Sequence, residues 1–254
     1  MKRLKALLSC AAVSLAMYTR LPMPHLHWTI ERMKYALGFF PLAGVLCGGA
    51  QALFLLLVRT TGVFGPSFRA AVLLALPIAV SGGIHLDGFC DVCDAAASHK
   101  SRQEQLEILK DSHCGAFAII GCGAFFVLSF AAWRDVDVFS PAAAALCFVP
   151  VLSRSLSGLA ACSFRNARGG GQLAAFTRTA DKRAIRAMLA GWLCLAAAGI
   201  AAFGGPLFAM LLGACAAFAL FSLWAVKTYG GFTGDLCGCL LEIVELVCVA
   251  AFTL

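Results

Sequence analysis

Long continuous runs of apolar residues, separated by short polar segments, extend along almost the whole chain. Seven of these runs approach the roughly 20 residues that a helix needs to cross a bilayer. They cover residues 36–58, 68–86, 115–133, 141–162, 186–203, 206–226 and 236–254. Because the runs do not alternate with polar residues, they predict helices rather than the strands of a membrane barrel. We therefore expect an all-α, polytopic membrane bundle of seven spans, with residues 1–254 forming one integral domain.

A shorter apolar stretch, residues 6–17, follows the basic sequence Met1-Lys2-Arg3-Leu4-Lys5 and ends before Pro22. The pattern predicts an uncleaved amphipathic helix that lies at the membrane interface. A cleaved signal peptide is the alternative, since a charged start followed by a short apolar stretch is also its signature.

Composition and charge strengthen the membrane interpretation. The chain is 61% hydrophobic and only 13% charged, with a net charge of +7. Sixteen of its twenty Lys and Arg residues fall in or beside the segments 1–35, 87–114, 163–185 and 227–235. Basic loops stay in the cytoplasm, so these segments predict the cytoplasmic side of a multi-pass protein in the cell inner membrane. The net positive charge is therefore explained by the basic loops on the cytoplasmic side. The sequence shows no clustered basic face with interleaved aromatic residues, so we do not expect it to bind nucleic acid.

Three aspartates follow the second apolar run. Asp87, Asp91 and Asp94 are spaced i, i+4 and i+7, which places them on one face of a helix. Like charges in one stripe repel each other, so they need a positive partner unless they form an ordinary solvated helix end. A divalent metal that carries phosphates is the simplest partner.

Other acidic residues fall at the same predicted side of the membrane. Asp111 precedes the third run and Asp235 begins the last one, where each is also suited to capping a helix. Glu242 and Glu245 lie inside the last run, where a carboxylate is costly unless it is paired. Arg154, inside the fourth run, suits either a glutamate or a phosphate.

Two further features leave alternatives open. The Gly-rich loop 163–185 contains Arg165 and Arg168, which suit a clamp on an anionic substrate or a simple topology anchor. The pair Cys90-x-x-Cys93 has the spacing of a zinc or redox site, but no second pair of ligands follows it. We expect the thirteen cysteines to be reduced and unpaired.

Five short motifs follow one another from near the N-terminus to the C-terminus. They are Thr19-Arg20-Leu21-Pro22-Met23-Pro24, Phe40-Pro41-Leu42-Ala43-Gly44, Gly83-Ile84-His85-Leu86-Asp87-Gly88 with Asp91 and Asp94, Lys110-Asp111-Ser112 with Gly115, and Phe232-Thr233-Gly234-Asp235 with Gly238, Glu242 and Glu245. In these motifs the chain resembles the cobalamin synthase family, the adenosylcobinamide-GDP ribazoletransferases. The departures from the family's pattern are Cys90, Cys93, Ala95-Ala96 and His113-Cys114, and they leave every acidic residue in place.

The resemblance implies a membrane transferase of the last steps of cobalamin biosynthesis, in the class that transfers substituted phosphate groups. It would join adenosylcobinamide-GDP to α-ribazole or α-ribazole 5′-phosphate with loss of GMP. Mg²⁺ is the expected cofactor, and lipid and a second copy of the chain are the expected further partners. The expected catalytic residues are Asp87, Asp91, Asp94, Asp111, Asp235 and, as the weaker base, His85. The expected metal ligands are Asp87, Asp91, Asp94, Asp235, Glu242 and Glu245, with the two glutamates alternatively paired to Arg154. The expected substrate-binding cations are Arg154, Arg165, Arg168 and Lys110.

Two other functions compete with this one. CDP-alcohol phosphatidyltransferases also present aspartates to Mg²⁺ and a nucleotide diphosphate, but Asp87-Gly88 lacks the Ala-Arg that follows in their pattern. A cation-coupled transporter would account for Glu242 and Glu245 inside a span. The absence of an internal repeat and the position of the other acids at span ends disfavour it.

Overall fold

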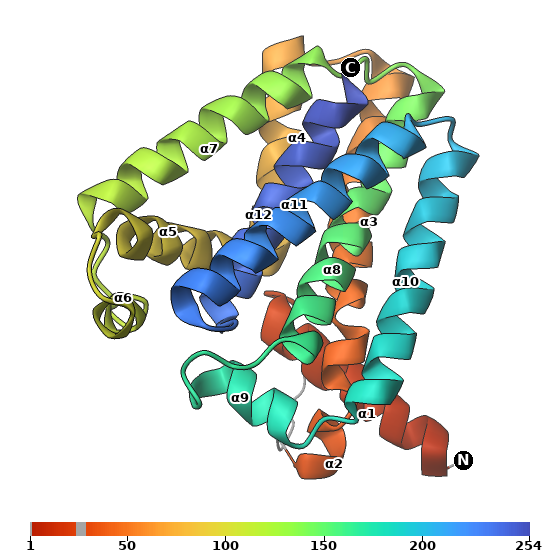
Figure 1. Cartoon of the computed structure of the whole chain (residues 1–254). Helices are drawn as coiled ribbons and strands as arrows, with labels where there is room; N and C mark the ends of the chain where they lie inside the picture. The colour runs from red at the N-terminus through yellow and green to blue at the C-terminus, as the bar shows by residue number, and fades with distance from the viewer. Residues whose placement is uncertain (1, 24–28) are drawn as a thin grey trace.

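The computed structural model describes residues 2–23 and 29–254 and is built from helices, as the apolar pattern predicts (Figure 1). Pro24, the last residue of the first motif, lies outside the described residues. The helices are α1 (Lys2–Tyr18), α2 (Ile30–Met33), η1 (Ala36–Phe39), α3 (Pro41–Thr61), α4 (Pro66–Ser81), α5 (Ile84–Ala97), α6 (Arg102–Ile108), α7 (Ala116–Asp135), η2 (Pro141–Phe148), α8 (Val149–Ser163), α9 (Gly171–Arg178), α10 (Lys182–Ala202), α11 (Leu207–Tyr229) and α12 (Gly234–Phe252).

Five helical segments in the described part of the chain are long and apolar enough to span a membrane. They are residues 36–61, 116–135, 141–163, 182–202 and 207–229, and the pair α4 and α5 would make a sixth. The predicted count of seven is therefore not confirmed. The helix α4 has only 16 residues, and α12 carries three carboxylates. The outer face of the bundle exposes large apolar side chains such as Leu53, Phe208 and Leu223, which suits contact with lipid.

The predicted second span, residues 68–86, is wrong in one respect. Its helix ends at Ser81, and the chain bends by 98° before α5 begins at Ile84. Gly82 and Gly83 both have left-handed φ angles, +73° and +79°, which residues with a Cβ rarely adopt. The helix α5 therefore leaves the direction of α4 and runs toward α6 and the start of α7 (Figure 1).

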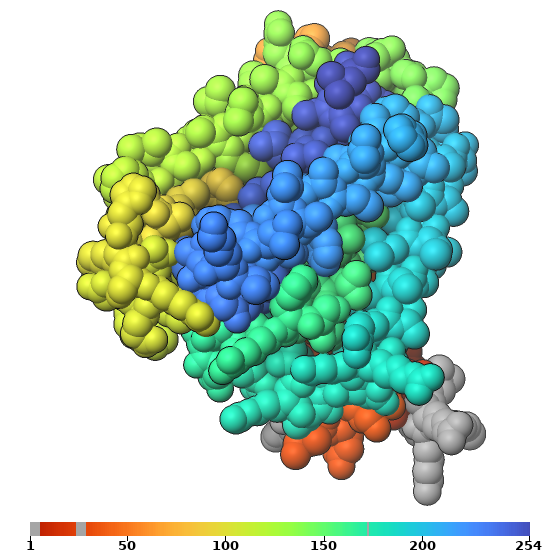
Figure 2. All heavy atoms as spheres, viewed as in Figure 1, coloured from red at the N-terminus to blue at the C-terminus, as the bar shows by residue number. Residues whose placement is uncertain are grey.

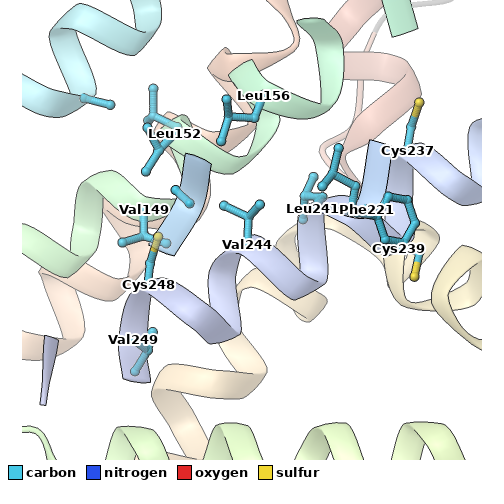
Figure 3. Packing of buried hydrophobic residues seen from close by; sticks show 14 of the residues in the cluster. Val149, Leu152, Leu156, Phe221, Cys237, Cys239, Leu241, Val244, Cys248 and Val249 are labelled. Atoms are coloured by element: carbon cyan, nitrogen blue, oxygen red, sulfur yellow. The ribbon is translucent and has the colours of Figure 1, made fainter. Parts of the chain in front are cut away.

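The helices α8 and α12 lie inside the bundle. The helix α12 packs against α5, α11, α8 and α7, and α8 packs against α3, α10 and α12. Figure 3 shows this core, in which Val149 and Leu152 of α8 and Val244 and Cys248 of α12 belong to one buried apolar cluster. Because α12 is enclosed by other helices, its polar residues are shielded from lipid.

The polar segments that the sequence places on one side meet at one end of the bundle. The amide of Asp181 donates to the carbonyl of Lys34, and the amide of Arg20 donates to the carbonyl of Val80. The end of α11 packs against α6 at this end, where both are visible in Figure 2. The C-terminus lies at the opposite end (Figure 1).

Candidate active site

Two glycines let α5 and α12 touch backbone to backbone. A Cβ atom on Gly88 would lie 2.8 Å from the Cα of Asp235, and one on Gly238 would lie 2.9 Å from the carbonyl oxygen of His85. No real side chain fits into either gap. This contact brings the first turn of α12, with Asp235, beside the first turn of α5, with Asp87.

The position of Asp235 is fixed by its neighbours. Thr233 caps α12, since its hydroxyl accepts from the amide of Leu236 at 3.2 Å and also donates to Asp235 Oδ2 at 3.2 Å. Arg168 forms an ion pair with the same oxygen, with Nη2 at 2.9 Å. The side chain of Asp235 is 24% exposed, so part of it remains accessible.

Arg168 reaches Asp235 because two loops pair beside the site. The amide of Phe232 donates to the carbonyl of Arg165 at 2.8 Å, and the amide of Ala167 donates to the carbonyl of Phe232 at 2.9 Å. These bonds tie the loop after α8 to the loop before α12. The side chain of Arg165 is exposed at the edge of this pair.

Asp91 lies one turn beyond Asp87 on α5 and is partly buried. Burial, followed by the negative charges of Asp87 and Asp235, raises the pKa of Asp91 to about 7, while Arg168 opposes the shift. The three carboxylates therefore form a negative cluster that one arginine only partly compensates. Such a cluster favours a cation or a positively charged ligand.

Asp94, the third aspartate of the stripe, makes a different contact. Its Oδ2 accepts from the amide of Gly115 at 2.7 Å, and its Oδ1 accepts from the amide of Ala118 at 2.9 Å. These are the free amides at the N-terminus of α7, so Asp94 caps that helix from a distant part of the chain. It fixes α7 against α5.

Asp111 and Lys110 each pair with a neighbouring side chain. Asp111 is exposed and accepts from His113, which lies 2.6 Å away and holds the pKa of this carboxyl below its usual range. Lys110 is exposed and pairs with Glu107 at 2.7 Å. Both residues lie in the segment between α6 and α7, whereas the other carboxylates lie on α5 and α12.

Glu242 and Glu245 also lie away from the aspartates. At 1.5 Å per residue they are about 10 Å and 15 Å along α12 from Asp235. Glu245 Oε1 accepts from Arg154 Nη1 at 2.6 Å and from the hydroxyl of Ser153 at 2.8 Å. Pairing with Arg154, one of the two roles that the sequence left open, is therefore present. Arg154 is only 1% exposed, so in this arrangement its guanidinium contacts protein rather than a ligand.

A cavity of about 300 Å³ opens beside the cluster. Asp87 and Asp235 line it at its polar edge, and His85 lines it from the first turn of α5. The rest of its wall is mainly apolar and comes from α1, η1, α8, α9 and α12; it includes Met17, Tyr18, Leu37, Phe40, Ala161 and Leu173.

The sequence assigned no role to Tyr18 or Phe40, two aromatic residues of this wall. Each stands at the edge of a motif that the sequence did identify, Tyr18 before Thr19 and Phe40 at the start of Phe40-Pro41. An aromatic residue beside such a motif was the available signal. It carried no weight because aromatic residues are common in apolar runs.

The described residues do not form a protein-only metal cage. No group of three or more His, Cys, Asp or Glu side chains among them is arranged to hold a metal ion. Asp87 and Asp91 nevertheless lie one helical turn apart on the same face, with Asp235 beside them. This arrangement suits an ion that takes one or two carboxylates and completes its shell with ligand oxygens.

Replacing Gly238 with alanine tests the contact between α5 and α12. The new Cβ would meet the backbone of His85, so the two helices must move apart and displace Asp235 from Asp87. A displacement of about 1 Å typically costs on the order of a hundredfold in rate. We expect the turnover assay described below to show such a loss for Gly238→Ala and no loss for Gly191→Ala, whose Cβ would meet open space. Equal activities would contradict the tight contact.

Nearly the whole chain is similar to known proteins. A family model described as cobalamin-5-phosphate synthase matches residues 11–253. The chain is 37% identical over 236 residues to the adenosylcobinamide-GDP ribazoletransferase of Lachnoclostridium phytofermentans. The aligned region covers 92% of this chain and 89% of that protein. It is 33% identical over 244 residues to the protein of that name from Desulfitobacterium hafniense, with 92% of each chain covered. No solved structure matches.

Proposed function

The chain belongs to the cobalamin-5-phosphate synthase family, and we propose that it joins adenosylcobinamide-GDP to α-ribazole or α-ribazole 5′-phosphate. In this reaction a ribose hydroxyl attacks the phosphorus that carries the cobinamide arm. An O–P bond forms, the anhydride P–O bond breaks, the hydroxyl proton passes to a base, and GMP leaves. The product is adenosylcobalamin or its 5′-phosphate.

The observation that best supports this chemistry is the meeting of Asp87 and Asp235 at the edge of a cavity, with Asp91 beside them. Transfer of a phosphoryl group needs little covalent help from a protein; it needs in-line positioning and compensation of charge. The apolar cavity positions one reactant, and the carboxylates lie where its polar end would emerge. Asp235, at the cavity edge, is the residue that we assign to orient the attacking hydroxyl.

Mg²⁺ is the cofactor that we propose. It is commonly held by one or two carboxylates together with substrate phosphates and water. Asp87 and Asp91, with Asp235, are the residues that we assign to hold it. When bound, it would neutralise charge on the anhydride and on the departing GMP.

The remaining polar residues divide into three groups. Arg168, already beside Asp235, and the exposed Arg165 suit the phosphates, because a guanidinium pairs with phosphate oxygens through two bonds. Asp94 acts through the cap of α7 and is a positioning residue. We leave five further candidates out of the proposed site: Lys110, Asp111 and Arg154 pair with Glu107, His113 and Glu245, and Glu242 and Glu245 lie about two to three turns along α12 from Asp235.

The orientation of the site is a further part of the proposal. The end of the bundle that carries most of the basic residues would face the cytoplasm of the cell inner membrane. The C-terminus, at the opposite end, would then lie outside. We expect alkaline phosphatase fused after Leu254 to be active and a fusion in the α5–α6 turn near His99 to be inactive. The reverse pattern would place the site on the outer side.

Release of GMP is the experiment that tests the reaction. Detergent-solubilised protein is incubated with adenosylcobinamide-GDP, α-ribazole and Mg²⁺, and GMP and the joined corrinoid are measured. We expect both products in equal amounts, and neither when any one component is omitted. A protein that forms no GMP with all three present would exclude the proposed transferase, and solute flux without GMP would favour a transporter.

A further inference from the structure

The cavity beside Asp87 and Asp235 is too small for a corrin ring. Its volume of about 300 Å³ is at the lower limit of small-molecule sites, which hold about 300–1,000 Å³. A nucleoside fits such a space, whereas a macrocycle with its amide side chains does not. Two of the proposed substrate parts are nucleoside-sized: the guanosine of one substrate and the ribazole of the other.

The wall of the cavity contains a group of three rings from distant parts of the chain. The rings of Tyr18 and Phe40 are 4.2 Å apart between centroids, and that of His85 lies 5.9 Å and 5.4 Å from them. They come from α1, from the residue that precedes α3, and from α5. Together with Leu37 and Leu173 they form an apolar and aromatic surface, which favours a flat apolar ring system.

One buried polar atom of this wall lacks a partner. His85 is 6% exposed, and its Nε2 has no hydrogen-bond partner in the described part of the chain. The hydroxyl of Ser157 already donates to the carbonyl of Cys237 at 2.8 Å. A buried polar atom without a partner is costly, so a ligand that pairs with Nε2 gains a hydrogen bond that the protein does not supply.

The bases of the two nucleoside-sized parts, guanine and dimethylbenzimidazole, differ in how many hydrogen bonds they need. Guanine carries several donors and acceptors around its edge, and burial against this wall would leave most of them unpaired. A dimethylbenzimidazole is apolar except for one ring nitrogen without a substituent, which accepts one hydrogen bond. The Nε2 atom of His85 can supply that one hydrogen bond.

We propose that this cavity binds the benzimidazole base of α-ribazole, with His85 Nε2–H donating to the unsubstituted ring nitrogen. The base lies against Tyr18 and Phe40, and the ribose emerges at the edge with Asp87 and Asp235. This inference rests on the proposed function, because it assigns one of the two proposed substrates to the cavity. It makes His85 a residue that selects the acceptor, instead of a general base.

Equilibrium binding to the full chain in detergent tests the proposal without turnover. The probes are α-ribazole and the matching riboside of dimethylindole, in which the ring nitrogen is replaced by C–H. We expect wild-type protein to bind α-ribazole up to about tenfold more tightly than the indole riboside, the value of one neutral hydrogen bond. His85→Phe keeps the ring and removes the donor, so it should bind both ribosides equally. His99→Asn, an exposed histidine elsewhere, should keep the wild-type preference.

A second variant keeps the test decisive if His85→Phe does not fold. Ala161→Leu adds carbon atoms to the cavity wall, and we expect it to weaken α-ribazole binding at least tenfold while adenosylcobinamide-GDP binding is retained. Ala144→Leu, which lines a different cavity beside α3, should weaken neither. Loss of adenosylcobinamide-GDP binding alone in Ala161→Leu would place guanosine in the cavity and overturn the proposal.

The outcomes separate this inference from the proposed reaction. Wild-type protein that binds both ribosides equally, or a His85→Phe protein that keeps the preference, overturns the role of His85 and leaves the transferase intact. Wild-type protein that binds neither riboside overturns the assignment of the cavity, whereas failure to release GMP is seen only in the turnover assay.

Discussion

An Asp91→Asn protein is expected to insert and fold normally and to release GMP about a thousandfold more slowly than the wild type. Asparagine keeps the size of the side chain and removes its charge. Loss of one electrostatic contact to a transition state typically costs about a hundredfold to a thousandfold in rate, and Asp91 lies in the cluster where the charge of the anhydride would be compensated.

The control for this variant is Asp135→Asn. Asp135 is an exposed aspartate, the last residue of α7, at the other end of the bundle. The Asp135→Asn protein should therefore be fully active. GMP release is measured over a range of Mg²⁺ concentrations, because weakened binding of the ion would raise the concentration needed. Near wild-type activity of Asp91→Asn at every concentration would remove the aspartate cluster from the mechanism.

Breaking the ion pair inside the bundle should have the largest effect on stability. Arg154 and Glu245 lie 2.6 Å apart, and their side chains are 1% and 15% exposed. Arg154→Met leaves Glu245 buried without its cation, and removing one member of a buried pair typically costs about 3–5 kcal/mol. We expect a large fall in the thermal midpoint of the detergent-solubilised protein.

Two comparisons test whether the charge pair itself is responsible. The double variant Arg154→Met with Glu245→Leu should melt at a higher temperature than Arg154→Met alone, because no unpaired charge is left behind. Lys110→Met breaks a pair of almost the same length, 2.7 Å, whose members are about half exposed. It should change the free energy of unfolding by about 1 kcal/mol or less. If the double variant melts at the same lowered temperature as Arg154→Met, the loss of stability comes from lost packing of the Arg154 side chain and not from the unpaired charge.

The sequence predicted those features that depend on local pattern. The apolar runs predicted the all-helical fold, because backbone groups in a bilayer must be satisfied within each segment. The spacing of Asp87, Asp91 and Asp94 placed them on one helical face. The cost of Glu245 inside an apolar run indicated that it binds a metal or pairs with Arg154, and the ion pair is present.

Features that depend on the meeting of distant segments were not predicted. The bend at Gly82 and Gly83 was missed because the sequence there continues an apolar run, and glycine is common in membrane helices. The role of Asp94 as a cap for α7 needs a contact across 21 positions of the chain. Asp111 shares the residue type of the cluster but not its location, because the segment between α6 and α7 holds it at the surface.

Cross-linking tests the central claim most directly. In a variant without the thirteen native cysteines, Asp87→Cys and Asp235→Cys are introduced together, and membrane vesicles are treated with a short membrane-impermeant bifunctional thiol reagent. We expect the two cysteines to be joined within one chain, from one side of the membrane only, because Gly88 contacts the backbone of Asp235. Labelling of the two positions from opposite sides would contradict a shared site between α5 and α12.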